Sequence, residues 1–479
     1  MNLFKTIFRF EWIQLKRQYA QLFALALFLI IGCYAVYSGS SVIKHQKTVI
    51  DTLNQQYNSD YELAVRKFTD TLTPESKAQA ANAGVPQAID FRLPPVASNQ
   101  PKGFASLAVG QRDVNPYYQK VRSQVDFLDN GNMELSNPST LSAGNFDLSF
   151  VLVYLLPLLI ITLCYGSYAE EKEQGTYALL TIQSASISRI MIYKLLFRAA
   201  VVLVVTGLLS SIAFIAAEII GATSLSDILL WSYITLMYIA FWFAVCYFFI
   251  QLKNSSIATA LKLVGVWLFF LIALPSITNA YLSLANPVPL RADLASFARH
   301  AAEEVWETKP AALAALFNKN NPQYNSSINP AKDSTQNGQR FIVGYYDLLE
   351  RKVSGYAKAI NDEIEARNAQ AQLLAKFSPS VTMQYLYNAI AQSGRDGHMD
   401  FQRQLSVFQK KWKHHIYSRQ LAEVNFTREE LKDLPKFTKA NPTSSTEILK
   451  GSLSIWAGLM LFLLLANWNG KRESSSINL

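Results

Sequence analysis

The chain has 479 residues, of which 50% are hydrophobic and only 16% are charged. Because soluble proteins carry about 25% charged residues, this composition excludes an ordinary soluble globule and indicates a membrane protein with soluble parts. The formal net charge of +9 is spread along the chain without a dense basic run, which argues against a nucleic-acid-binding protein.

Six apolar stretches are long enough to cross the roughly 30 Å of hydrocarbon in a bilayer, which takes about 20 helical residues. They cover residues 21–43, 146–168, 195–220, 227–252, 257–284 and 449–468. The predicted fold class is therefore an all-α polytopic membrane protein with six transmembrane helices. The first stretch exceeds the roughly 7–15 apolar residues of a signal peptide, and no small-residue cleavage site follows it. We expect it to remain as a membrane anchor.

Basic residues flank the predicted spans on one side only. They precede the first and third spans, separate the fourth from the fifth, and follow the sixth: Lys5, Arg9, Lys16, Arg17, Arg189, Lys194, Lys253, Lys471 and Arg472. Short basic segments stay on the cytoplasmic side of a membrane. We therefore expect residues 1–20 and the tail 469–479 to be cytoplasmic, and the long loops 44–145 and 285–448 to be extracytoplasmic.

The first long loop begins as a continuation of the first span. Apolar residues from Ile43 to Leu72 recur mostly at three- and four-residue steps, and no Pro or Gly lies between Gly39 and Pro74. This pattern predicts one continuous helix from residue 20 to residue 72, about 80 Å long, with a helical extension over 44–72. Prolines break the pattern from Pro74 onward, so we expect the rest of this loop to be irregular.

The second long loop, 285–448, is predicted to form a large helical domain. Residues 291–318 and 341–377 carry apolar positions at helical spacing. Ser378 and Pro379 have the residue types of a helix start, and Thr427 with Glu430 forms a capping-box pair.

A distinctive segment, 169–194, lies between the second and third spans on the predicted cytoplasmic side. It contains an acidic cluster from Glu170 to Glu173, then Gly175-Thr176, a short amphipathic helix, Ser188-Arg189 and Lys194. Such an exposed helical elbow could dock onto a cytoplasmic partner. On residue types alone, a solvated loop without a partner is equally consistent.

This order of residues resembles the signature of the ABC type-2 permeases, the membrane subunits of ATP-driven exporters. The usual signature has Leu and Pro where this chain has Tyr177 and Ala185. Residues 8–17 are similar to the amphipathic elbow helix with which such permeases begin. Residues 378–384 and 433–437 are similar to a permease subgroup with two enlarged extracytoplasmic loops and a helical domain of unknown function in the second.

The resemblance implies the permease subunit of an ABC exporter in a bacterial cytoplasmic (inner) membrane, surrounded by membrane lipid. Its implied partners are two copies of an ABC ATPase subunit, which bind ATP and Mg, and a second permease, either an identical copy or a sister chain. Either cargo passes between the permeases, or the outer domain transmits force to an envelope partner. Segment 169–194 would be the coupling segment, with ATPase-coupling residues Glu171, Glu173, Gly175, Thr176, Leu179, Leu180, Ile182, Ser188 and Arg189.

The sequence contains no pattern of a catalytic or metal site. No Gly-x-x-x-x-Gly-Lys-[Ser/Thr], His-Glu-x-x-His or Gly-x-Ser-x-Gly occurs, and no CxxC pair is present. We therefore predict a non-catalytic subunit without a cofactor or metal of its own. Two alternatives stay open, a membrane-anchored scaffold or receptor and an enzyme without ATPase coupling.

Two basic residues lie near the ends of predicted spans, Arg198 and Lys262. We expect their long side chains to extend toward the membrane surface.

Overall fold

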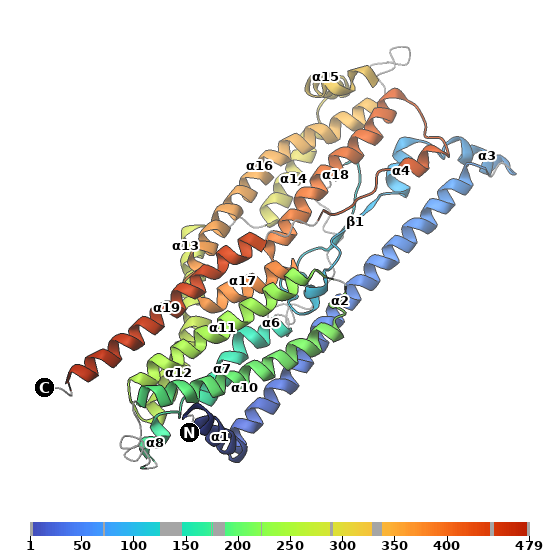
Figure 1. The fold of residues 1–479 in the computed structure, drawn as a ribbon. Helices are drawn as coiled ribbons and strands as arrows, with labels where there is room; N and C mark the ends of the chain where they lie inside the picture. Colours follow the sequence, from blue (N-terminus) through green and yellow to red (C-terminus); the bar gives the residue numbers. More distant parts are fainter. Residues whose placement is uncertain are drawn as a thin grey trace.

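A single helix of 49 residues, α2 (Tyr19–Lys67), runs along most of the length of the molecule (Figure 1). At 1.5 Å per residue it is about 74 Å long, more than twice the thickness of the hydrocarbon core. The predicted continuation of the first span into the first loop is therefore confirmed. The helix ends at Lys67 rather than at residue 72.

The computed structural model describes residues 3–69, 72–124, 146–173, 175, 187–221, 223–287, 291–327, 338–440 and 445–476. In the first half of the chain the elements are α1 (Leu3–Arg17), α2, α3 (Pro74–Ala81), α4 (Pro86–Arg92), β1 (Val96–Ser98), η1 (Gly103–Ser106), β2 (Tyr118–Lys120), α6 (Leu148–Phe150), η2 (Val151–Leu155), α7 (Leu156–Cys164), α8 (Ala169–Glu173) and α10 (Ile187–Ala216). They continue with α11 (Leu225–Gln251), α12 (Ser256–Leu268), η3 (Phe269–Ala273), α13 (Leu274–Ala285), α14 (Arg291–Trp306), α15 (Pro310–Asn320), η4 (Pro322–Ser327), α16 (Gly338–Ala375), α17 (Pro379–Ala391), α18 (Arg395–Ala422), η6 (Glu430–Asp433) and α19 (Ser445–Ser476).

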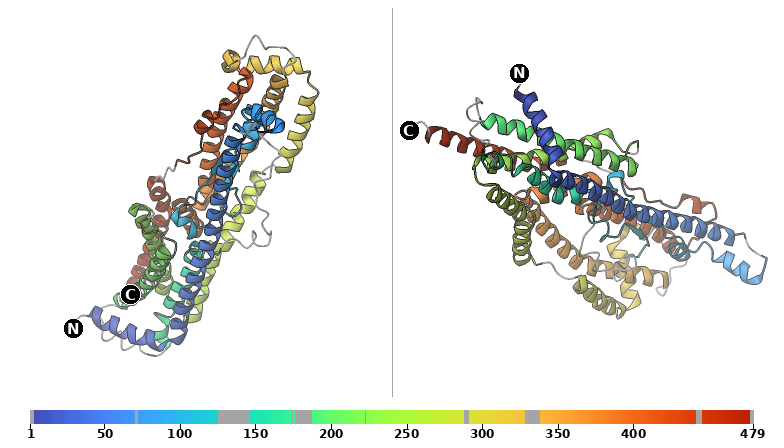
Figure 2. Two further views of the ribbon diagram at one scale, coloured as in Figure 1. Left: turned by 90° about the vertical axis from the view of Figure 1, so that its right-hand side faces the viewer. Right: turned by 90° about the horizontal axis from the view of Figure 1, so that it is seen from below.

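Six of these described helices are long and apolar enough to cross a membrane, which confirms the predicted fold class. They are Tyr19–Lys67, Leu148–Glu173, Arg189–Ala216, Leu225–Gln251, Ser256–Ala285 and Ile448–Asn469. The two termini of the chain lie at the same end of the bundle in all views (Figures 1 and 2). We call this the proximal end, and we call the opposite end, where α15 lies, the distal end.

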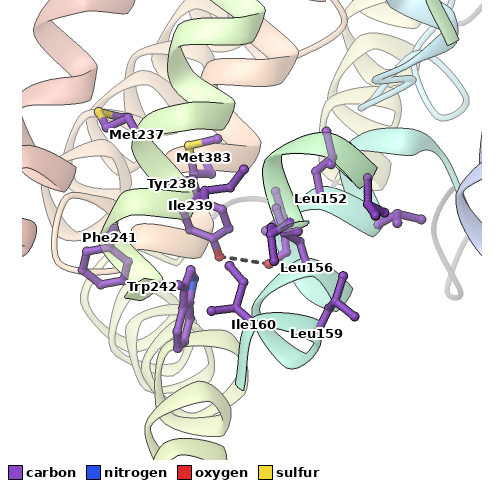
Figure 3. Packing of buried hydrophobic residues seen from close by; sticks show 14 of the residues in the cluster. Leu152, Leu156, Leu159, Ile160, Met237, Tyr238, Ile239, Phe241, Trp242 and Met383 are labelled. Atoms are coloured by element: carbon purple, nitrogen blue, oxygen red, sulfur yellow. Dashed lines mark hydrogen bonds between the residues drawn. The ribbon is translucent and has the colours of Figure 1, made fainter. Parts of the chain in front are cut away.

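Helix α11 lies at the centre of the span bundle. It packs against α7, α10, α12, α17 and α19, and its Trp231, Tyr238 and Trp242 are fully buried. Figure 3 shows Tyr238 and Trp242 facing Leu156 and Ile160 of the second span. Aromatic rings of this size bury the largest apolar areas of any side chains, so they fix the spacing between the helices.

Two prolines interrupt the spans, and each follows a π-helical turn. Pro157 follows η2 and Pro275 follows η3. A proline has no N–H, so a carbonyl one turn earlier loses its helical partner. Side chains from other helices bond two carbonyls at these turns: the Tyr238 hydroxyl donates to the Val153 oxygen over 2.9 Å, and the Ser378 hydroxyl donates to the Phe270 oxygen over 2.9 Å. Such replacement bonds are what permits helix interruptions at membrane depth.

Both long loops, and not the second loop alone, build the part of the molecule at the distal end, which we call the distal domain. Asp90 of α4 accepts a hydrogen bond from the indole of Trp412 in α18 over 2.7 Å and from the Ser123 hydroxyl over 2.7 Å. Around it lies an apolar core that includes Ile89, Phe401 and Trp412. The carboxylate and its partners are buried, so the two loops are held together by a satisfied polar contact inside an apolar core.

Between residues 72 and 124, the first loop has more regular structure than the sequence predicted. Pro74 and Pro86 begin the short helices α3 and α4 instead of breaking the chain, because a proline fits the first helical turn, where its missing N–H has no partner to lose. Strands β1 and β2 pair antiparallel over three residues each.

In the second long loop, the predicted capping pair Thr427–Glu430 is confirmed: the Glu430 carboxylate accepts the Thr427 N–H over 2.8 Å.

Helix α17 lies in the span bundle and not among the other helices of residues 285–448. It packs against α11 and α19, and its Met383, Leu386 and Tyr387 belong to the same buried cluster as the spans. The Tyr387 hydroxyl lies 2.8 Å from the Thr235 hydroxyl of α11. The predicted helix start at Ser378 and Pro379 is confirmed.

Candidate functional site

Four charged side chains meet at the proximal end of the bundle, and two of them belong to segment 169–194, which the sequence singled out. Lys194 of α10 lies between two carboxylates, with its Nζ 3.0 Å from Glu11 Oε1 of α1 and 2.5 Å from Glu171 Oε1 of α8. Arg198 Nε lies 3.3 Å from Glu11 Oε2. We call Glu11, Glu171, Lys194 and Arg198 the proximal charge cluster. With two acids and two bases, it is balanced in charge.

The proximal charge cluster is buried. Glu11, Lys194 and Arg198 are 3%, 4% and 5% exposed, which is rare for charged residues unless they are paired. Arg198 also donates to the Leu163 carbonyl oxygen and, over 2.6 Å, to the Ser167 hydroxyl. The expectation that Arg198 extends toward the membrane surface is therefore wrong, because buried acceptors from α1 and the end of the second span hold its guanidinium inside. Lys262 is exposed.

A second polar contact joins α8 to the start of the fifth span. Glu173 accepts the Ser256 backbone N–H over 3.0 Å and the Ser256 hydroxyl over 3.0 Å. Ser256 is the first residue of α12, where N–H groups have no helical partner. A carboxylate at this position both satisfies such donors and interacts favourably with the helix dipole.

The structure places the remaining predicted coupling residues only in part. Gly175 follows α8 with a backbone φ of +74° and with open space around it. Ser188 and Arg189 lie in the first turn of α10, and the Arg189 side chain is exposed. Thr176, Leu179, Leu180 and Ile182 lie outside the described residues. Glu171, which is half-buried, and Glu173, which is exposed, thus anchor one flank of the segment to α10 and α12, and α10 carries the other flank.

The sequence predictions missed Glu11, Lys194 and Arg198 as parts of this site. One available signal was Glu11, the single acid in stretch 3–17, whose other charged residues are all basic. Another was the pair Lys194 and Arg198, one helical turn apart at the start of an apolar span, where a buried charge needs a partner. Only the folded chain shows that the acid and the bases meet.

Among the described residues, no group of three or more His, Cys, Asp or Glu side chains could hold a metal ion. His300 Nδ1 lies 3.7 Å from Glu303, but both side chains are 79% exposed. This geometry fits an ordinary surface pair on α14.

Two family matches cover the spans and the distal domain separately. Residues 107–246 match the family described as ABC-2 membrane transporter related, and residues 293–439 match the family described as Domain of unknown function (DUF3526). These two matches are consistent with an ABC-2 type permease that carries an extra domain. No curated protein and no solved structure shows significant similarity to it.

The two matched regions are interlocked in the structure. The first matched region, 107–246, begins in the first long loop and extends through the second span and segment 169–194 to include most of α11. The second matched region, 293–439, extends from α14 to beyond η6. The second region includes α17, which packs inside the span bundle. The extra domain is therefore built into the permease and is not a separate attachment. The match over 107–246, together with the six apolar helices, supports a multi-pass, permease-type transport subunit, and proteins of the ABC-2 family work in general with an ABC ATPase.

Proposed function

We propose that this chain is the permease subunit of an ATP-binding cassette exporter and couples ATP hydrolysis in a separate subunit to export or to conformational work in the cell envelope. In this proposal the proximal end faces the cytoplasm of a bacterium and the distal domain is extracytoplasmic. Two ATPase subunits, which bind ATP and Mg, act on a pair of permeases, either two copies of this chain or this chain and a sister.

The proximal charge cluster is the observation that supports this proposal most directly. Segment 175–187 connects α8 to α10, and a partner that pushes on it would act on both helices. Glu171 transmits such a displacement to Lys194, and Lys194 and Arg198 transmit it to Glu11 of α1. Glu173 extends the linkage to the start of α12. One push at the proximal end would therefore move α1 together with the second, third and fifth spans.

The centre of the bundle offers a route from the spans to the distal domain. The Tyr238 hydroxyl bonds the second span, and Ser380 of α17 lies 3.4 Å from the same hydroxyl. Ser378 bonds the fifth span at η3. Helix α17 is therefore tied to two spans at their interrupted turns, where a helix bends most easily. In the proposed mechanism, rearrangement of these spans shifts α17 and the distal helices connected to it.

Co-purification of the ATPase subunit with the permease tests the proposal. Leu179, Leu180 and Ile182 are expected to enter an apolar groove of the ATPase, with the acidic residues and Arg189 at its rim. Burial of one Leu stabilises a complex by about 1.5–3 kcal/mol. Leu180→Asp should therefore weaken docking at least tenfold and abolish permease-stimulated ATP hydrolysis.

Arg189→Gln is the matched control, because a rim charge should change affinity much less. Gly175→Val should impair stimulation even where the complex assembles, since a β-branched residue resists a positive φ. If Leu180→Asp kept wild-type co-purification and stimulation, the segment would not couple to an ATPase, and a membrane-anchored scaffold would become the better description.

A further inference from the structure

A cavity lies beside α17 near the distal end of the span bundle. Its volume is about 560 Å³, within the range of roughly 300–1,000 Å³ typical of small-molecule sites. It is bounded by α16, by α17 and by the first turn of α18, with Gln111 of the first loop and Ile448 of α19 at its edge. Segments from both long loops and from the sixth span therefore contribute to one site.

Helix α17 has two faces of opposite character. Met383, Leu386, Tyr387 and Ile390 are buried against the spans. Gln384, Asn388 and Gln392 recur at four-residue spacing and face the cavity. The helix starts beside Phe270, near the midpoint of the fifth span, so its polar face lies alongside the spans. A polar helix face at this depth is stable where it lines a water-filled space.

Carboxamides dominate the lining of the cavity. Six of them converge there from three parts of the chain: Gln111, Asn368, Gln372, Gln384, Asn388 and Gln392. A carboxamide offers both donors and an acceptor, which matches hydroxyl groups that also do both. The charged groups of the lining are one base, Arg395, and two acids, Asp396 and Asp400, so no strong field of one sign favours an ionic ligand.

Few side chains of the lining are aliphatic or aromatic. They are Val381, Ala389 and Ile448, together with the ring of Tyr385. Tyr385 is 40% exposed, and its hydroxyl donates to Asp396 over 2.7 Å. Three aliphatic side chains offer few side-chain pockets for a peptide. The ring of Tyr385 suits the C–H face of a pyranose.

We propose that the cavity beside α17 binds an uncharged, polyhydroxylated ligand such as a sugar chain, as a station on the transport path. The inference rests on the proposed permease function, and it identifies the class of substrate. The contacts of α17 with the second and fifth spans would then connect occupancy of the cavity to the span geometry.

Binding can be measured on the full chain in lipid nanodiscs, without an ATPase, without nucleotide and without glycosidic detergent. The probes are maltotriose, mannotriose and triacetylchitotriose, with trigalacturonate as a charged comparison and trialanine as a peptide comparison. We expect at least one neutral trisaccharide to bind in saturation-transfer NMR and titration calorimetry, and the two comparison probes to bind at least tenfold more weakly.

The double variant Asn368→Leu/Gln372→Met removes two carboxamides at nearly constant volume. It should weaken trisaccharide binding at least tenfold, whereas Asn361→Leu, an exposed site on α16 outside the cavity lining, should leave it unchanged. The proposal is overturned if no neutral trisaccharide binds, if trialanine or trigalacturonate binds best, or if the double variant binds normally. Loss of ATPase co-purification with intact sugar binding would instead contradict the coupling proposal alone.

Discussion

Glu11 and Arg198 form a buried ion pair although they lie 187 residues apart in the chain, with Arg198 Nε 3.3 Å from Glu11 Oε2. The pair fastens the amphipathic helix α1 to the third span. It also places α1 beside the flank of the coupling segment, because Lys194 contacts both Glu11 and Glu171. The position of α1 is therefore set by electrostatics in addition to the apolar contacts of its Ile7 and Leu15.

Removal of Glu11 should destabilise the protein strongly. Glu11→Ala leaves two bases and one acid in a buried site, and an uncompensated buried charge costs about 3–5 kcal/mol. We expect a clearly lower thermal unfolding midpoint for the full chain in detergent. The double variant Glu11→Ala/Arg198→Ala should lose less than the sum of the two single variants.

Arg9→Ala is the control, since Arg9 lies on the same helix with an exposed side chain. Its unfolding midpoint should match that of the wild type. Equal midpoints for Glu11→Ala and Arg9→Ala would show that the ion pair does not hold α1 in place.

The spans and the long first helix could be predicted because both depend on local patterns. Hydropathy over about 20 residues marks a span, and the spacing from Ile43 onward marks a helix. The contact between Glu11 and Arg198 could not be predicted in this way. It depends on how α1 folds back onto α10, which no local pattern encodes.

The position of α17 illustrates a second limit. The helix start at Ser378 and Pro379 is a local signal and was predicted. The place of α17 among the spans was not predicted, because 13 residues are too few to be recognised as a span.

Tyr238 should contribute to stability through its hydroxyl. Tyr238→Phe keeps the ring but leaves the Val153 carbonyl without its donor next to Pro157. An unsatisfied buried acceptor costs about 1–3 kcal/mol, so we expect a lower unfolding midpoint and a change in the signal from the buried tryptophans nearby. Tyr37→Phe is the control, because Tyr37 is 72% exposed. Similar midpoints for the two variants would contradict a structural role for this bond.

The orientation in the membrane can be tested with single cysteines in a chain whose Cys33, Cys164 and Cys246 have been replaced. Ser406 of α18 and Lys172 of α8 have exposed side chains at the distal and proximal ends. Because short basic segments stay in the cytoplasm, we expect a membrane-impermeant maleimide to label Ser406→Cys in intact spheroplasts. Lys172→Cys should react only after lysis. The reverse pattern would invert the proposed topology.

Lys439 should make the stability of the distal domain depend on pH in the alkaline range. Burial lowers the pKa of Lys439 to about 8 from an ordinary value of 10.5, and the nearby positive charge of Arg112 lowers it further. Between these two values the unfolded chain holds a proton that the folded chain has released, so the free energy of unfolding rises with pH. Lys439→Gln removes this proton while its amide can still donate to Asn99, the present partner at 2.7 Å.

We therefore expect Lys439→Gln to be more stable than the wild type near pH 7, and the difference to shrink from pH 8 to about 10.5. Thermal unfolding of the full chain across this range measures it, with the exposed Lys436→Gln as the control that should follow the wild type. If Lys439→Gln kept the wild-type pH profile as well, the lysine would not carry its buried charge in the folded protein.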